Sequence, residues 1–133
     1  MNYGMIFIRR FQIKRVVMNF KELDAYIRTK EGVTFDYPFD DKVRVYRISE
    51  KMFALTSEDR PISVNLKCDP IYALELRSLY EGVIAGYHMN KMHWNTVTVE
   101  DSDVDEETVK ELIDHTYELV YEKLTKKQKV LLG

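Results

Sequence analysis

Three short runs of alternating apolar and polar residues, between positions 43 and 68, are the feature that most limits how this chain can fold. The first run covers residues 43–48, the second residues 52–56 and the third residues 62–68. Only short polar segments separate the runs, 49–51 in one turn and 57–61 in the other. A strand, a tight turn and a second strand predict a hairpin, and the third run extends the hairpin to an antiparallel meander.

Helix signals precede the meander and also close the chain. Asn19 is a good N-cap, Glu22 occupies the third helical position, and Gly32 marks the end of this first helix. The last helix opens on the acidic run 101–107, because negative charge suits a helix N-terminus. Its apolar stripe runs through residues 109–124. We therefore expect a helix near each end of the domain.

A further helix is predicted directly after the meander. It begins at Asp69-Pro70, since aspartate caps free N–H groups and proline suits the first helical position. We expect it to run to about Tyr80. Its predicted sheet-facing side is formed by the apolar residues Ile71, Leu74 and Leu79, with Ala73 and Leu76 nearby.

Three less regular segments complete the pattern. Residues 33–39 alternate, but Pro38 confines them to a sheet edge or an irregular extended segment. Residues 82–86 predict a loop, and residues 94–99 predict a final strand. Because the elements do not form repeated βαβ units, the sequence predicts an α+β fold. We expect one compact domain, in which a twisted antiparallel sheet is packed with helices at both termini.

Composition supports one ordinary globular domain. Of the 133 residues, 45% are hydrophobic and 32% are charged, which suffices for a core without disulfides or a structural metal. The longest apolar run, residues 5–8, is cut off by Arg9 and Arg10, so we predict no membrane span and no membrane partner. The single cysteine, Cys68, allows no internal disulfide and fits a reducing compartment. We therefore expect a cytoplasmic protein.

The first 17 residues differ from the rest in charge. Their basic side chains, with no acid among them, are Arg9, Arg10, Lys14 and Arg15. Residues 18–133 hold 16 basic and 22 acidic side chains, a formal charge of −6, which argues against bulk electrostatic binding of nucleic acid and leaves a localised patch as the alternative. We interpret residues 1–17 as an N-terminal extension of a domain that spans 18–133. A true start at Met18 is the other interpretation.

The segment 82–96 is the stretch that most suggests a functional site, because it holds two of the three histidines and the only tryptophan. It offers rings that can stack and side chains that can bond to phosphates or bases. The candidate residues for nucleic-acid contact, from this segment and the neighbouring strand, are Lys67, Tyr87, His88, Asn90, Lys91, His93, Trp94 and Asn95. A structural alternative stays open, in which the histidines hold an irregular loop by hydrogen bonds and Trp94 is a core residue.

The same segment supports an enzyme or a metal site less well. His88 and His93 are five residues apart, so they do not share a helical face, and no cysteine or HExxH companion completes a metal geometry. Neither histidine has an evident nucleophile to activate as a general base. Cys68 lies on the apolar side of its strand, as buried and inert thiols do. No GxGxxG or GxxxxGK[ST] loop occurs, so we expect no metal, no cofactor and no enzymatic activity.

Six strings of the sequence carry a resemblance to a known family. They are VNLKCDP at 64–70, GYHMNK at 86–91, HWNTV at 93–97, LIDHTY at 112–117, GVTFDYPF at 32–39 and KMFAL at 51–55. With these strings the chain closely resembles the MmcQ/YjbR family of small bacterial proteins, over about residues 18–125. It departs from the usual family pattern at Ala85, where proline is frequent, and at Thr116, where serine is usual.

The resemblance implies a compact α+β fold related to the CyaY-like and secretion-chaperone-like architectures, in a double-wing arrangement. It also implies DNA binding, and it attaches no enzymatic activity and no cofactor. Our leading hypothesis is a cytoplasmic DNA-binding module that uses the eight candidate residues. The alternative is a protein-interaction or chaperone-like adaptor that exposes an apolar face to a partner chain. A small-molecule enzyme built on the histidine loop ranks third.

Overall fold

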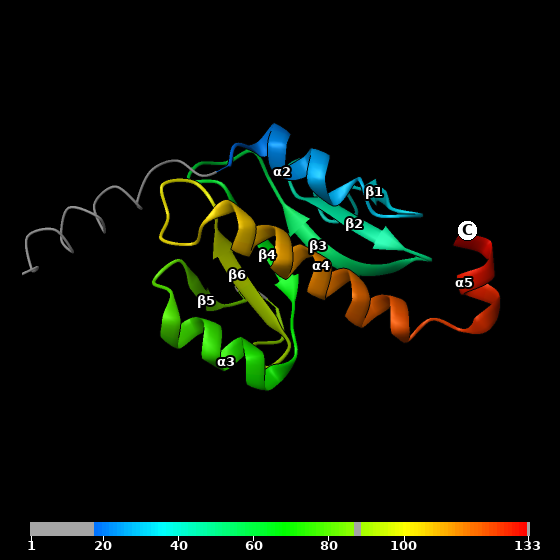
Figure 1. The fold of residues 1–133 in the computed structure, drawn as a ribbon. Coiled ribbons are helices and arrows are strands. Elements are labelled where there is room, and N and C mark those ends of the chain that lie inside the picture. The colour runs from blue at the N-terminus through cyan, green and yellow to red at the C-terminus, as the bar shows by residue number, and fades with distance from the viewer. Residues whose placement is uncertain (1–17, 87–88, 133) are drawn as a thin grey trace, which may run out of the picture.

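The computed structural model describes residues 18–86 and 89–132 and shows the predicted α+β fold (Figure 1). Six strands form one antiparallel sheet in the order β1-β2-β3-β4-β6-β5. In chain order, the strands are β1 (Thr34–Asp36), β2 (Arg44–Ile48), β3 (Lys51–Thr56), β4 (Ser63–Lys67), β5 (Val83–Ala85) and β6 (Trp94–Thr98). The predicted meander is confirmed, since β2, β3 and β4 are consecutive antiparallel neighbours.

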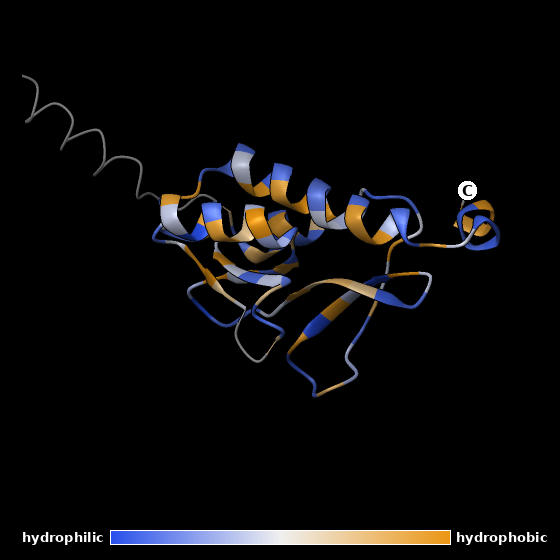
Figure 2. Ribbon diagram, turned by 90° about the horizontal axis from the view of Figure 1, so that it is seen from below, coloured by the Kyte–Doolittle hydropathy of each residue, from blue (hydrophilic) through white to orange (hydrophobic). Residues whose placement is uncertain are grey.

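The helices of the described chain are α2 (Phe20–Ile27), α3 (Pro70–Leu79), α4 (Glu106–Glu122) and α5 (Lys126–Leu132). Helices α2, α3 and α4 cover one face of the sheet, and the short α5 stands apart at the C-terminal end (Figure 1; Figure 2). Asn19 and Glu22 cap α2 reciprocally, and Asp69 caps α3, as the sequence predicts. None of the helices in the described ranges has both the length and the apolar character needed to cross a bilayer.

The main core fills the space between the helices and the sheet. Leu23 and Ile27 of α2 and Ile113 of α4 belong to it, together with the fully buried rings of Tyr46 and Phe53 from the sheet. A second, smaller apolar cluster is centred on Val45, Leu55 and Trp94, with Val43, Met52 and Met89 packed against it. Trp94 therefore packs in this second cluster and not in the helix-covered core.

The expected orientation of α3 is wrong. Ile71, Leu74 and Leu79 remain 71%, 62% and 71% exposed, and the buried residues are Ala73 and Leu76. The small Ala73 side chain permits close approach to the sheet, which a larger aliphatic side chain at that position would prevent. Arg77 further fixes this orientation, because its Nε donates to the Asn95 side chain on β6 at 2.7 Å. The helix thus turns an apolar face outward.

Two local predictions also change. Residues 82–86 are not a loop throughout, because Val83–Ala85 form the edge strand β5 and pair with β6. The turn between β2 and β3 is one residue shorter than predicted: Ser49 and Glu50 form it with positive φ angles of 46° and 71°, and Lys51 already pairs with Ile48. Positive φ at both central residues is the geometry of a two-residue hairpin turn.

The N-terminal extension predicted at residues 1–17 lies outside the described residues. The described chain begins at Met18, which is 1% exposed and part of the main core. Its backbone N–H donates to the carbonyl oxygen of Val99 at 3.1 Å, just beyond the end of β6. This bond places Met18 at the end of β6 opposite to Trp94.

Candidate functional site

The structure brings only some of the eight candidate residues together. Tyr87 and His88 lie outside the described residues. Lys67 and Trp94 are direct partners across the β4–β6 pair, at the last position of one strand and the first of the other. Directly paired residues on antiparallel strands project to the same face of a sheet. Lys67 and Trp94 therefore share one end and one face of the sheet.

Asn95 has a structural role. Its side chain is 2% exposed, and its Oδ1 accepts the Arg77 Nε–H at 2.7 Å. Its Nδ2 donates to the carbonyl oxygen of Ala73 at 3.4 Å. Both bonds join β6 to α3, so this amide is satisfied within the protein and faces the helix layer.

The loop before β6 is organised by Asn90. Its Oδ1 accepts the Met92 N–H at 2.9 Å, and its carbonyl oxygen accepts the N–H groups of His93 and Trp94 at 3.1 and 3.0 Å. The carbonyl oxygen of His93 in turn accepts the Cys68 N–H at 2.8 Å. These bonds favour a structural account of Asn90, with its side chain engaged in the turn.

Lys91 is exposed, as are its neighbours Asn90 and Met92. Its carbonyl oxygen accepts a hydrogen bond from Arg77, whereas no described residue pairs with its ammonium group.

Cys68, at the end of β4, is buried, and burial raises the pKa of its thiol to about 11. The thiol is therefore protonated at neutral pH, which agrees with an inert cysteine.

A depression of about 380 Å³ opens beside Lys67 and Trp94. It is lined by three lysines and three apolar side chains, namely Lys51, Lys67, Lys123, Met52, Trp94 and Val120. Lys51 is the first residue of β3, Lys67 the last of β4 and Lys123 the C-cap of α4. The lysine depression, as we call it, thus forms where the end of the sheet meets the end of α4.

The electrostatics of the lysine depression are unbalanced. Burial lowers the pKa of Lys67, and the positive charges of Lys123 and Lys51 lower it further. Among the residues that the structure describes, no carboxylate forms an ion pair with any of the three lysines. A partly buried cation beside two like charges costs free energy that nothing in the described chain offsets. Such an arrangement is typical of a binding site for an anion.

Thr116 of α4 holds the backbone of Lys67 in place. Its Oγ1 accepts the Lys67 N–H at 2.9 Å and donates to the carbonyl oxygen of Phe53 at 2.8 Å. Thr116 is fully buried, its bond to Phe53 is buried and its bond to Lys67 is partly buried. The hydroxyl therefore joins α4 to β3 and β4 immediately beneath the lysine depression. A serine at this position would supply the same hydroxyl.

Sequence reasoning identified Lys67 and Trp94 but missed Lys51 and Lys123. Lys51 had an available signal: once residues 52–56 and 62–68 form an antiparallel pair, the start of the first lies beside the end of the second. Lys123 had none, because its place depends on the direction in which α4 crosses the sheet.

A larger depression, of about 570 Å³, lies between α4 and α5. Its lysines already have partners, since Lys30 pairs with Asp114 and the Lys129 Nζ lies 5.1 Å from the centre of the Tyr121 ring. Across residues 18–86 and 89–132, no group of three metal-ligating side chains comes together. The lysine depression is thus the better candidate for a charged ligand.

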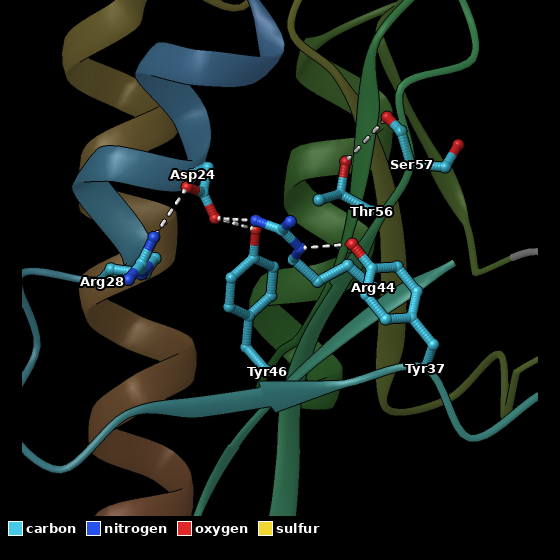
Figure 3. A network of polar contacts seen from close by, with 7 residues as sticks. All are labelled: Asp24, Arg28, Tyr37, Arg44, Tyr46, Thr56 and Ser57. Atoms are coloured by element: carbon cyan, nitrogen blue, oxygen red, sulfur yellow. Dashed lines mark hydrogen bonds and ion pairs between the residues drawn. The ribbon is translucent and has the colours of Figure 1, made fainter. Parts of the chain in front are cut away.

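The polar network around Asp24 has a structural explanation (Figure 3). Asp24 Oδ1 accepts hydrogen bonds from Arg44 Nη1 at 2.6 Å and from the Tyr46 hydroxyl at 2.7 Å, and Arg44 Nε donates to the Tyr37 hydroxyl at 2.9 Å. Burial opposes ionisation of Asp24, but these hydrogen bonds and the charge of Arg44 lower its pKa overall. Asp24 pairs with both Arg44 and the exposed Arg28, and the network ties α2 to the first strands of the sheet.

Comparisons with known proteins agree with this fold. A model of the YjbR family matches residues 28–119. The uncharacterized protein YbdF of Escherichia coli O157:H7 is 36% identical over 92 residues, which is 68% of this chain and 75% of that protein. The uncharacterized protein YjbR of Escherichia coli K12 is 31% identical over 117 residues, 86% of this chain and 98% of that protein.

Solved structures are similar over much of the chain. The crystal structure of the Deinococcus radiodurans protein DR2400 superposes with a TM-score of 0.80, at 33% identity, and covers 88% of this chain and 89% of that one. A crystal structure from Pseudomonas syringae gives a TM-score of 0.67 at 26% identity, over 77% of this chain and 98% of that one.

Proposed function

The chain belongs to the YjbR family, and we propose that within this fold the lysine depression binds the phosphate backbone of DNA. The observation that carries the proposal is the presence of three lysines without carboxylate partners around one opening. Lysine and arginine supply the sequence-independent part of nucleic-acid affinity by neutralising phosphates. The described residues concentrate such charge here although residues 18–133 are acidic as a whole.

The number of lysines sets the expected strength. Three lysines neutralise at most three phosphates, so the slope is no steeper than about −2.7 when the logarithm of the association constant is plotted against that of the salt concentration. Affinity for duplex DNA then falls by at most about 40-fold between roughly 50 and 200 mM salt. Binding of this kind is weak and positions the protein on DNA, whereas sequence readout requires contacts to base edges. Lys91, exposed in the loop before β6, is proposed as a further phosphate contact.

The test is binding of the full chain to a fluorescent duplex at two salt concentrations, with Lys67→Gln compared with Lys21→Gln. Lys21 is exposed on α2, which enters the fold at the opposite end of β4 and β6, so its substitution removes the same charge elsewhere. We expect Lys67→Gln to weaken binding and to reduce the salt slope by about one. Equal effects of the two substitutions, or no binding at low salt, would overturn the proposal.

A specific observation favours a second candidate function, a protein-interaction adaptor. The outward face of α3 presents Ile71, Leu74 and Leu79 to solvent at more than 60% exposure each. Exposed large apolar side chains that gather on one element are a feature of protein-binding surfaces. Leu74→Glu separates the two candidates: it disrupts a partner complex formed on α3 and leaves DNA affinity unchanged.

A further inference from the structure

The three lysines come from three different elements and line one opening. Lys51, Lys67 and Lys123 belong to β3, β4 and the end of α4. A surface that follows a nucleic-acid strand spaces its cations along a groove, one for each phosphate. Here, by contrast, two lysines are close enough to Lys67 to lower its pKa. Three positive charges therefore act on one small volume.

We infer that the lysine depression binds a terminal phosphate, a phosphomonoester, in preference to the internal phosphodiesters of a continuous strand. This inference rests on the proposed function and specifies its ligand: the phosphorylated end of a nucleic-acid strand. A phosphomonoester carries about −1.5 to −2 charges at neutral pH and has three strong acceptor oxygens. An internal phosphodiester carries about one negative charge. Three ammonium groups around one opening match the terminal group better.

The apolar part of the opening suits what is attached to that phosphate. Met52, Trp94 and Val120 line the depression together with the lysines. Its volume of about 380 Å³ exceeds the needs of a phosphate alone and lies within the usual range of small-ligand sites, about 300–1,000 Å³. Trp94 is 7% exposed, so it contributes apolar wall to the depression and not an open stacking face. The sugar of a terminal nucleotide can lie against this wall.

Structural roles account for only part of the cluster. Lys123 at the C-cap of α4 suits the negative end of the helix dipole, and Lys51 is exposed at the start of β3. Lys67 is different, because its side chain is partly buried beside two other cations. No described carboxylate pairs with it, and its backbone N–H is already bonded to Thr116. A bound dianion supplies the missing counter-charge.

The experiment compares a single-stranded oligonucleotide that carries a 5′-phosphate with the same oligonucleotide that ends in a hydroxyl. Both are measured with the full chain by fluorescence polarisation, with the dye on the 3′ end. We expect about tenfold tighter binding of the phosphorylated strand, as for loss of one hydrogen-bonded charged group. The preference should disappear in Lys67→Gln and in Lys123→Gln, and it should persist in Lys21→Gln.

Adenosine 5′-monophosphate and inorganic phosphate, used as competitors, distinguish the source of the phosphate. Equal, lysine-dependent binding of both oligonucleotides overturns this inference and leaves the proposed function standing. Lysine-dependent binding of the mononucleotide, measured directly by isothermal titration calorimetry, without binding of either oligonucleotide supports a phosphomonoester site and overturns the nucleic-acid function. No lysine-dependent binding of any of these probes overturns both. Circular dichroism of each variant checks that the fold is intact.

Discussion

Thr116 and Lys67 are joined by a hydrogen bond that takes the place of pairing with β3 at the end of β4. The Thr116 Oγ1 accepts the Lys67 N–H at 2.9 Å, and it donates to the Phe53 carbonyl oxygen at 2.8 Å. The register of β3 and β4 places Phe53 opposite Lys67, directly after the last recorded pair, Ala54 with Leu66. The Thr116 side chain thus supplies a hydrogen-bond partner for one backbone group of each strand, at the point where the β3–β4 pairing stops. Lys67 itself lines the depression.

Thr116→Val should destabilise the protein, although valine has nearly the same shape as threonine. It leaves the Lys67 N–H and the Phe53 carbonyl without their partner, and a buried unsatisfied polar group costs about 1–3 kcal/mol. Urea unfolding monitored by circular dichroism measures the loss. Thr116→Ser is the matched control, because it keeps the hydroxyl and removes one methyl group. Equal stability of the valine and serine variants would contradict the role of the hydroxyl.

The orientation of α3 predicts opposite outcomes for two neighbouring leucines. Leu76 is 3% exposed, so Leu76→Ala should reduce the free energy of unfolding by about 2–5 kcal/mol. Leu74 is 62% exposed, so Leu74→Ala should change it by no more than about 0.5 kcal/mol. Chemical denaturation of both variants decides the matter. A larger loss for Leu74→Ala would restore the orientation that the sequence pattern first indicated.

The β2–β3 turn contains backbone strain that one substitution relieves. Glu50 has a φ angle of 71°, in the left-handed region that costs a residue other than glycine roughly 1–2 kcal/mol. Glu50→Gly removes this cost but adds freedom to the unfolded chain, so we expect a net gain of about 0.5 kcal/mol. Thermal unfolding provides the measurement. Glu58→Gly, in the next exposed turn, is the control and should only destabilise, since residue 58 has no positive φ angle.

His115 should make stability depend on pH in a defined window. Burial lowers its pKa, although the nearby charges of Asp69 and Glu118 act in the opposite direction. Its Nε2 accepts the Asp69 N–H at 3.2 Å, which only the neutral imidazole can do. The folded state therefore binds this proton less readily than the unfolded state does, so the contribution of His115 is complete above about pH 6.5. It is lost as the pH falls from there through the lower folded-state pKa.

Urea unfolding of the wild type between pH 7 and pH 5 measures this dependence, with His115→Gln as the control. The glutamine side chain can still accept the Asp69 N–H but does not titrate, so the decline in this window should flatten. Asp24 contributes in a separate window, because its pKa is lowered and its stabilising contribution disappears only at more acidic pH. An identical decline in the variant would exclude His115 as the cause.

Local signals explain why most of the fold could be predicted. The Asn19–Glu22 capping pair and the Asp69-Pro70 start act within one helical turn, so they can be identified without tertiary context. The direction in which α3 faces could not be predicted, because apolar residues lie on both of its sides. The choice depends on the small size of Ala73 and on the bond from Arg77 to β6.

In the candidate site, too, the residues marked by local sequence signals could be predicted and those that depend on the whole fold could not. Lys67 and Trp94 belong to two of the strings that carry the family resemblance, at 64–70 and 93–97, so both entered the prediction. Lys51 and Lys123 come from elements whose meeting at one end of the sheet is a property of the whole fold. Strand β5 was missed because it has only three residues and lies between Gly82 and Gly86, so it has the composition of a loop.

The two outermost strands of the sheet have a consequence for how the protein behaves at high concentration. Strands β1 and β5 are each three residues long, and they form the two edges of the sheet. An edge strand is where a second molecule can add its own strand and start an ordered aggregate, and a very short edge gives such an addition few hydrogen bonds to form. The central strands, which are long enough to act as a template, have both of their sides occupied. The short edge strands therefore disfavour edge-to-edge polymerisation.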